Sequence, residues 1–116
     1  PDANVHFYRN FPAEDYARLI NNTAVLVGNS SSALREGAYL GVPAVNVGTR
    51  QGGREHAANV RHADYDPDAI ELAAREQMDH GRYESSHMFG DGHAGQRIAN
   101  LLAESEIVVQ KRLAYA

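Results

Sequence analysis

Hydrophobic and polar positions follow two alternating patterns along the chain, in which short apolar runs are separated by longer amphipathic stretches. This alternation is typical of strands and helices that succeed one another around a parallel sheet. The sequence therefore predicts an α/β fold with a Rossmann-like parallel sheet flanked by helices. The apolar runs predict strands at residues 5–8, 24–27, 44–47 and 59–62, the last of them short and at an edge of the sheet.

The amphipathic stretches predict helices over residues 12–21, 31–40, 67–80 and 94–105. Pro12 suits the first turn of a helix, Gly41 suits a helix end, and Asp66 is a plausible N-cap. The last two helices each have an apolar side that we expect to face the sheet. The residues on these sides are Ile70, Leu72 and Ala73 in the first of the two, and Ile98, Leu101 and Leu102 in the second.

Two further segments have weaker patterns. Residues 81–92 are polar and are expected to be irregular, with a turn at Gly90-Asp91-Gly92 that places Asp91 near the start of the last helix. Residues 107–113 are apolar enough either to extend the last helix or to form a separate arm.

Composition limits the classes of function. A chain of 116 residues with 43% hydrophobic residues suits one domain with one modest core. A net charge of −4 gives no broad cationic field, so neither nucleic acid nor an anionic membrane is an expected partner. There is no cysteine and no run long enough to span a bilayer, which fits a cytoplasmic protein. The six histidines lack the spacings of zinc sites, so we expect no metal and no cofactor.

The most informative segment is the junction between the predicted strand at 24–27, which we expect to be buried, and the helix that follows it. Gly28 and Asn29 end the strand, and Ser30, Ser31 and Ser32 stand where the helix begins. The first N–H groups of a helix lack intrahelical partners and carry partial positive charge, so this junction suits a phosphate. The alternative is plain N-capping, for which one of these residues would suffice.

Glu36 adds a second feature to this junction. It lies four residues after Ser32, so the two side chains share a face of the predicted helix. The carboxylate is about 6 Å farther along the axis, too far to serve the same phosphate. It is well placed to accept from both hydroxyls of a neighbouring ribose. The alternative is a solvated glutamate on the surface.

The loop after the predicted strand at 44–47 carries Arg50, Gln51 and Arg54 around two glycines. Guanidinium groups bind phosphate oxygens through a planar fork, so the loop suits a diphosphate. Two surface arginines on a mobile loop are the alternative. Because ligands of open α/β sheets bind beyond the carboxyl ends of the strands, we expect this loop and the serine junction to form one cleft.

Three segments of the chain resemble the UDP-N-acetylglucosamine 2-epimerase family. The segments are Gly28-Asn-Ser-Ser-Ser-Ala-Leu-Arg-Glu36, Gly41-Val-Pro-Ala-Val-Asn-Val-Gly-Thr-Arg-Gln-Gly-Gly-Arg-Glu55 with Asn59-Val60, and Phe89-Gly-Asp-Gly-His-Ala94. The second is more similar to the hydrolysing branch, which releases UDP and N-acetylmannosamine. The resemblance implies a glycosyltransferase-B type architecture, with a UDP-sugar between two Rossmann-like domains. Residues 1–116 would be the later part of the C-terminal domain.

The resemblance also implies roles for individual residues. Ser30 and Ser31 would hold the diphosphate together with the neighbouring Ser32, and Glu36 would hold the ribose. Arg50 would contact the phosphates or the sugar, with Gln51 and Arg54 on the same loop. The loop that contains Asn10 and Phe11 would lie near the uracil. Ala33 departs from the glycine of many relatives, which affects how closely the helix approaches its ligand.

The resemblance also implies that the acidic and histidine residues that perform the chemistry of this family lie outside this chain, as does its N-terminal domain, so no catalytic residue is predicted here. We expect residues 1–116 to bind UDP or a UDP-N-acetylhexosamine, to need the missing N-terminal domain for activity, and to self-associate as a homo-oligomer through exposed apolar edges. The alternatives are a non-catalytic module that binds sugar nucleotides or phosphosugars, and a related glycosyltransferase.

Overall fold

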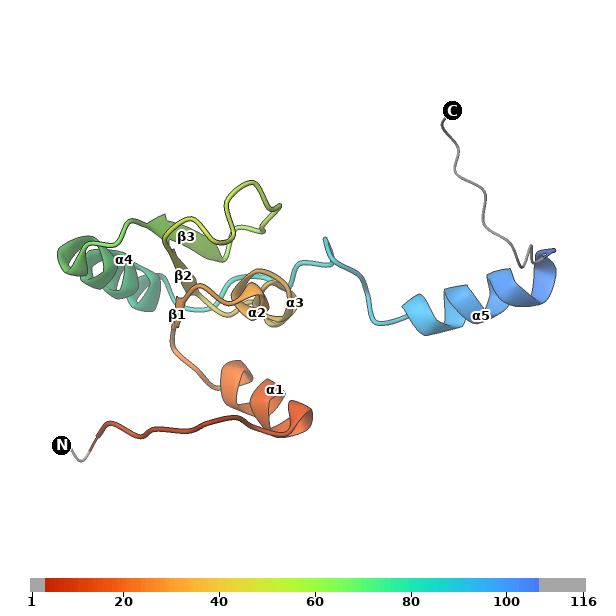
Figure 1. Cartoon of the computed structure of the whole chain (residues 1–116), viewed down its shortest axis with the longest axis horizontal. Coiled ribbons are helices and arrows are strands. Elements are labelled where there is room, and N and C mark those ends of the chain that lie inside the picture. Colours follow the sequence, from red (N-terminus) through yellow and green to blue (C-terminus); the bar gives the residue numbers. More distant parts are fainter. Residues whose placement is uncertain (1–3, 107–116) are drawn as a thin grey trace.

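The computed structural model describes residues 4–106, which form a three-stranded parallel sheet with helices around it (Figure 1). The strands are β1 (Leu26–Gly28), β2 (Ala44–Val47) and β3 (Val60–Ala63), in the order β1-β2-β3. In the register, Ala44 lies between Leu26 and Val60. The predicted α/β class with a Rossmann-like parallel sheet is therefore confirmed.

The helices of the described residues are α1 (Ala13–Asn21), α2 (Ser31–Leu34), α3 (Glu36–Leu40), α4 (Pro67–His80) and α5 (Ala94–Glu104). In Figure 1 α4 and the α2–α3 pair lie on opposite sides of the strands, while α5 lies away from the sheet at the far end of the molecule. None of the helices in residues 4–106 is long and apolar enough to cross a membrane.

The core lies between α2 and the sheet. Ala33 and Leu34 pack against Ala44 and Val60, with Leu26 at the margin of the cluster. Each of these residues is apolar, so the cluster gains from removal of its surface from water. The core is small and its centre is the strand β2, which is buried along most of its length.

Two buried polar contacts tie the elements together around this core. The Asn59 side chain, just before β3, donates hydrogen bonds to the carbonyl oxygens of Ala33 (3.1 Å) and Val42 (2.9 Å).

Gly41 ends α3 with a left-handed φ of 69°, and a Cβ atom there would collide with the carbonyl oxygen of Tyr83. Glycine is therefore required at this helix end both by the backbone conformation and by the close approach of residue 83.

Several predicted elements agree with the structure. The strand at Ala44–Val47 has the predicted bounds, and the predicted strand at 59–62 is the edge strand β3, one residue later. The helices predicted from residues 12, 67 and 94 are α1, α4 and α5, and residues 81–92 are irregular. The side chain of Asp66 caps α4 by accepting from the N–H of Ala69, as predicted.

Two strand predictions are wrong in part or whole. The apolar run at 24–27 becomes a strand only from Leu26, and β1 is at the edge of the sheet, so Val27 is 49% exposed instead of buried. Residues 5–8 form no strand, and Val5, Phe7 and Tyr8 are exposed. An apolar run gives a tendency to form a strand, but a strand exists only where its backbone pairs with a neighbour.

The helix predictions also need corrections. The helix predicted over 31–40 is interrupted at Arg35 (φ −97°, ψ −75°), which separates α2 from α3. On α4, Ile70 and Ala73 are half-buried as expected, but Leu72 is 60% exposed. The inward side predicted for α5 is wrong, because Ile98, Leu101 and Leu102 are all more than half exposed. The prediction for residues 107–113 lies outside the described residues.

Candidate functional site

The loops that follow β1 and β2 meet at the carboxyl edge of the sheet. The Gln51 side chain is buried and donates a 2.8 Å hydrogen bond to the carbonyl oxygen of Asn29. Arg50 makes a longer contact of 3.5 Å with the side-chain oxygen of Asn29. The two loops are neighbours because β1 and β2 are paired and parallel, so both strands end at the same edge. The expected meeting of the two loops is confirmed.

The serine junction between β1 and α2 is held by a chain of hydrogen bonds. Ser30 is the N-cap of α2, and its hydroxyl accepts from the N–H of Ser32 at 3.3 Å. The hydroxyls of Ser30 and Ser32 are 2.9 Å apart, and the Ser32 hydroxyl is 2.7 Å from that of Tyr16 on α1. Capping therefore accounts for Ser30, and Ser32 is engaged with α1. Among the described residues, Ser31 is the serine of the three whose side chain makes no hydrogen bond, and it lines a cavity together with Arg54.

The break at Arg35 changes how Glu36 is presented. The prediction that Ser32 and Glu36 share the face of one helix is wrong, because α2 ends at Leu34 and Glu36 is the first residue of α3. Glu36 lines a cavity of about 600 Å³, and Ser31 lines a neighbouring one of about 230 Å³. Arg35 and Phe89 line both cavities, so the two adjoin each other at these residues.

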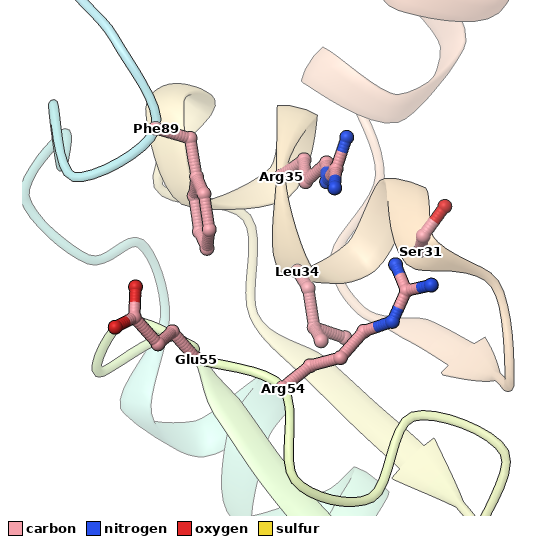
Figure 2. A pocket seen from close by; sticks show the side chains of 6 residues that line it. All are labelled: Ser31, Leu34, Arg35, Arg54, Glu55 and Phe89. Atoms are coloured by element: carbon pink, nitrogen blue, oxygen red, sulfur yellow. The ribbon is translucent and has the colours of Figure 1, made fainter. Parts of the chain in front are cut away.

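The smaller cavity combines three elements of the fold. Figure 2 shows the Arg54 guanidinium extending toward Ser31, with Glu55 and the ring of Phe89 on the other side and the Glu55 carboxylate directed away from Arg54. Leu34 forms the apolar floor between them. Within residues 4–106, neither Arg54 nor Glu55 has a hydrogen-bond or ion-pair partner for its side chain. Both charges are therefore free to bind a ligand.

The other predicted site residues lie at some distance from this cavity or serve another contact. Arg50 and Gln51 hold the loop to Asn29 and do not line the cavity. Asn10 and Phe11 precede α1, and the ring of Phe11 lies 4.9 Å from that of Tyr8. Neither Asn10 nor Phe11 is among the lining residues of the cavity.

Besides the apolar Leu34, three lining residues were not among the predicted site residues, namely Arg35, Glu55 and Phe89. A signal for each was present in the sequence, because Arg35 precedes Glu36, Glu55 follows Arg54, and Phe89 begins the segment before the last helix. All three are part of the segments that carry the family resemblance. The sequence did not show that these residues converge on one cavity from separate segments, and this convergence is what identifies them as site residues.

Next to the larger cavity, Asp91 forms an ion pair with Arg97 of α5. The hydrogen bond from Arg97 and a second from the backbone N–H of His93 lower the pKa of Asp91 from 3.8 to about 2. This pair fixes the first turn of α5. Across the part of the chain that the structure describes, no group of His, Cys, Asp or Glu side chains is arranged to hold a metal ion.

Taken together, the carboxyl edge presents separate cationic and anionic groups around one cavity. Arg35 and Arg54, with the Ser31 hydroxyl, suit an anion such as a phosphate. The carboxylates of Glu55 and, in the adjoining cavity, Glu36 suit hydroxyl or N–H donors. The arrangement fits a ligand that joins an anionic group to neutral, hydroxyl-rich groups.

Comparison with known proteins gives a family for the chain. Residues 1–103 match the family model described as UDP-N-acetylglucosamine 2-epimerase. A UDP-N,N'-diacetylbacillosamine 2-epimerase (hydrolyzing) of Legionella pneumophila is 35% identical over 104 residues, which are 88% of this chain and 26% of that protein. A UDP-N-acetylglucosamine 2-epimerase of Neisseria meningitidis serogroup B is 31% identical over 105 residues, which are 85% of this chain and 28% of that protein.

A third relative, the polysialic acid biosynthesis protein P7 of Escherichia coli, is 41% identical over 58 residues, which are 50% of this chain and 15% of that protein. The chain thus spans about a quarter of the length of the two relatives that match most of it. The model match covers nearly all of the chain, and the parallel sheet and its carboxyl-edge loops agree with the segments of the resemblance. The chain belongs to the UDP-N-acetylglucosamine 2-epimerase family.

Proposed function

We propose that residues 1–116 are the UDP-binding part of a UDP-N-acetylglucosamine 2-epimerase that hydrolyses its substrate to UDP and N-acetylmannosamine. The name of the Legionella relative, a hydrolysing epimerase, supports this branch of the family. The whole enzyme would have two Rossmann-like domains with the substrate between them. Its acid and base groups would come from outside residues 1–116, so this chain contributes binding and orientation.

The observation that carries the proposal is the convergence of Ser31 and Arg54 on one cavity from two different loops. Arg54 has no partner within residues 4–106, which makes its guanidinium available to an anion. A free arginine beside a hydroxyl at the carboxyl edge of a parallel sheet is an arrangement that suits a phosphate group. In the proposal, Arg54, Arg50 and the serine junction hold the diphosphate.

In the proposed reaction the bond between the sugar and the diphosphate breaks, and negative charge develops on the departing UDP. Fixed cationic groups stabilise such charge most when they are already in place before the reaction. Arg50 is oriented by its contact with Asn29, and that loop is held by the buried Gln51. Glu36, in the adjoining cavity, would accept hydrogen bonds from the ribose and so fix the nucleoside end.

The test is titration of UDP into the protein of natural length by calorimetry, for the wild type and for Ser31→Ala, Arg50→Ala and Arg54→Ala. A hydrogen bond to a charged group contributes about 1.5–3 kcal/mol, so loss of either arginine should weaken UDP binding by about tenfold or more. Loss of the Ser31 hydroxyl should have a smaller effect, about threefold to tenfold.

Arg75→Ala is the matched control, because Arg75 is an exposed arginine on α4 that pairs with Glu71 away from the cavity. Its UDP affinity should equal that of the wild type. If all three site variants bind UDP as tightly as Arg75→Ala does, the assignment of this edge to the diphosphate is wrong.

A further inference from the structure

The smaller cavity has two chemically different sides. On one side are the Arg54 guanidinium and the Ser31 hydroxyl, and on the other are the Glu55 carboxylate and the Phe89 ring (Figure 2). Arg54 and Glu55 are consecutive in the sequence, yet their side chains do not pair with each other. The opposite charges are therefore held apart across the cavity instead of neutralising one another.

Such a division of charge gives a ligand a direction. A phosphate is attracted to the arginine side and repelled from Glu55. A group that lies on the Glu55 side must be uncharged or cationic, and it gains most if it donates hydrogen bonds, because an ionised carboxylate only accepts them. The ring of Phe89 adds a flat apolar surface on the same side, which suits the C–H face of a sugar ring.

The volumes indicate how a sugar nucleotide would divide between the two cavities. Pockets that hold a whole ligand of that size have volumes of about 300–1,000 Å³. The cavity at Glu55 measures about 230 Å³, which is too small for the whole ligand and leaves room for the diphosphate and the adjoining sugar. The adjoining cavity, lined by Glu36, measures about 600 Å³ and remains for the nucleoside. Arg35 and Phe89, which line both cavities, mark the boundary between them.

We propose that Glu55 and Phe89 form the sugar side of this site, and that Glu55 selects uncharged hexoses over sugars that carry a carboxylate. This inference rests on the proposed function, since it assumes that the arginine side holds the diphosphate of a UDP-sugar. Glu55 accepts hydrogen bonds from hydroxyl or N–H groups of the sugar, and its charge repels an acidic sugar. Selection by repulsion of the wrong ligand is a common source of specificity.

Glu55 is exposed, so its repulsion of an acidic sugar acts through water and is modest. Two like charges about 4–5 Å apart in water repel each other by about 1 kcal/mol, which corresponds to about fivefold in affinity. Because Glu55 is exposed, salt should reduce this discrimination.

The experiment uses two ligands that differ only at C6, UDP-glucose with a hydroxymethyl group and UDP-glucuronic acid with a carboxylate. Dissociation constants of both, and of UDP, are measured by calorimetry with the protein of natural length at low and high salt. The wild type should bind UDP-glucuronic acid about fivefold more weakly than UDP-glucose at low salt, and less so at high salt.

Glu55→Gln keeps the size of the side chain and a hydrogen-bond acceptor but removes the charge. It should bring the ratio of the two dissociation constants close to one, and it should not weaken the binding of UDP, because the removed charge repels the diphosphate. Phe89→Leu should reduce the gain in affinity from UDP to UDP-glucose by about fivefold, as the ring surface is lost. Glu14→Gln, at an exposed position in the first turn of α1, is the matched control and should keep the ratio of the wild type.

The outcomes separate the two proposals. If the wild type binds UDP and UDP-glucose but Glu55→Gln keeps the discrimination of the wild type, the inference about Glu55 is wrong and the proposed function stands. An equal loss of affinity for UDP and UDP-glucose in Glu55→Gln also overturns it, because Glu55 would then act on the nucleotide. If the wild type binds neither ligand, the proposed function itself fails.

Discussion

Helices α4 and α5 both have an apolar side in the sequence, yet only α4 packs against the sheet. Gln77 of α4 is fully buried, and its side chain donates to the carbonyl oxygens of Ala44 (2.7 Å) and Asn59 (2.8 Å). No residue of α5 is buried, although Ile98, Leu101 and Leu102 form its apolar side. An amphipathic pattern thus indicates that one side of a helix is apolar, but it does not identify the surface against which that side packs.

The connections explain the difference. Only residues 64–66 separate β3 from α4, and such a short connection returns the helix onto the sheet that it has just left. By contrast, residues 81–93 run from α4 past the end of α3 and then away from the sheet before α5 begins (Figure 1). The chain path, and not the strength of the apolar pattern, decides which helix contributes to the core.

The largest expected effect on stability comes from comparing a leucine of a helix that packs against the sheet with a leucine of α5. Leu34 is almost completely buried between α2 and the sheet, and Leu34→Ala should lower the free energy of unfolding by about 3 kcal/mol, because it leaves a cavity. Leu101→Ala on α5 removes the same atoms from an exposed position and should change it by less than about 0.5 kcal/mol. Urea denaturation of the 116-residue chain measures both. Equal losses would show that α5 is buried in solution.

A second comparison tests the anchor of α4. Gln77→Ala removes the two donated hydrogen bonds and the partner of the Tyr83 hydroxyl, and should cost about 2 kcal/mol of unfolding free energy. Gln96 on α5 bonds only to the exposed side chain of Asn100, so Gln96→Ala should have little effect. The same denaturation experiment decides. A Gln77→Ala protein as stable as Gln96→Ala would mean that packing alone holds α4.

The smallest effect concerns the ion pair at the start of α5. Because Arg97 and the N–H of His93 lower the pKa of Asp91 to about 2 in the folded chain, the pair stabilises this turn above the ordinary carboxyl pKa near 3.8. This contribution is lost as the pH falls from about 4 through about 2. Amide hydrogen exchange of residues 94–98 should therefore accelerate over that range in the wild type. In Asp91→Asn it should be faster already at neutral pH, and an unchanged rate would show that the pair does not hold the turn.

The sequence predicted much of the fold and a smaller part of the site. The strand at Ala44–Val47, the cap at Asp66 and the helix end at Gly41 follow from local signals, since each depends on residues close together in the chain. Residues 5–8 and the break at Arg35 do not, because strand pairing and the path of the chain over the core depend on distant neighbours. The site follows the same division. Ser31 and Arg54 were predicted from local motifs, whereas Glu55 and Phe89 were not, because their place in the cavity depends on segments far apart in the chain.

By itself, the sequence determined the α/β class, the family and the two loops that carry hydroxyls and arginines. These depend on periodicity, on turn residues and on short motifs, all of which are local properties of the chain. Only the tertiary structure decided that Ser32 turns to Tyr16, that Glu36 faces a second cavity, and that Glu55 and Phe89 stand opposite Arg54. Those directions are set by packing between segments far apart in the sequence, where the position of one side chain depends on all of its neighbours.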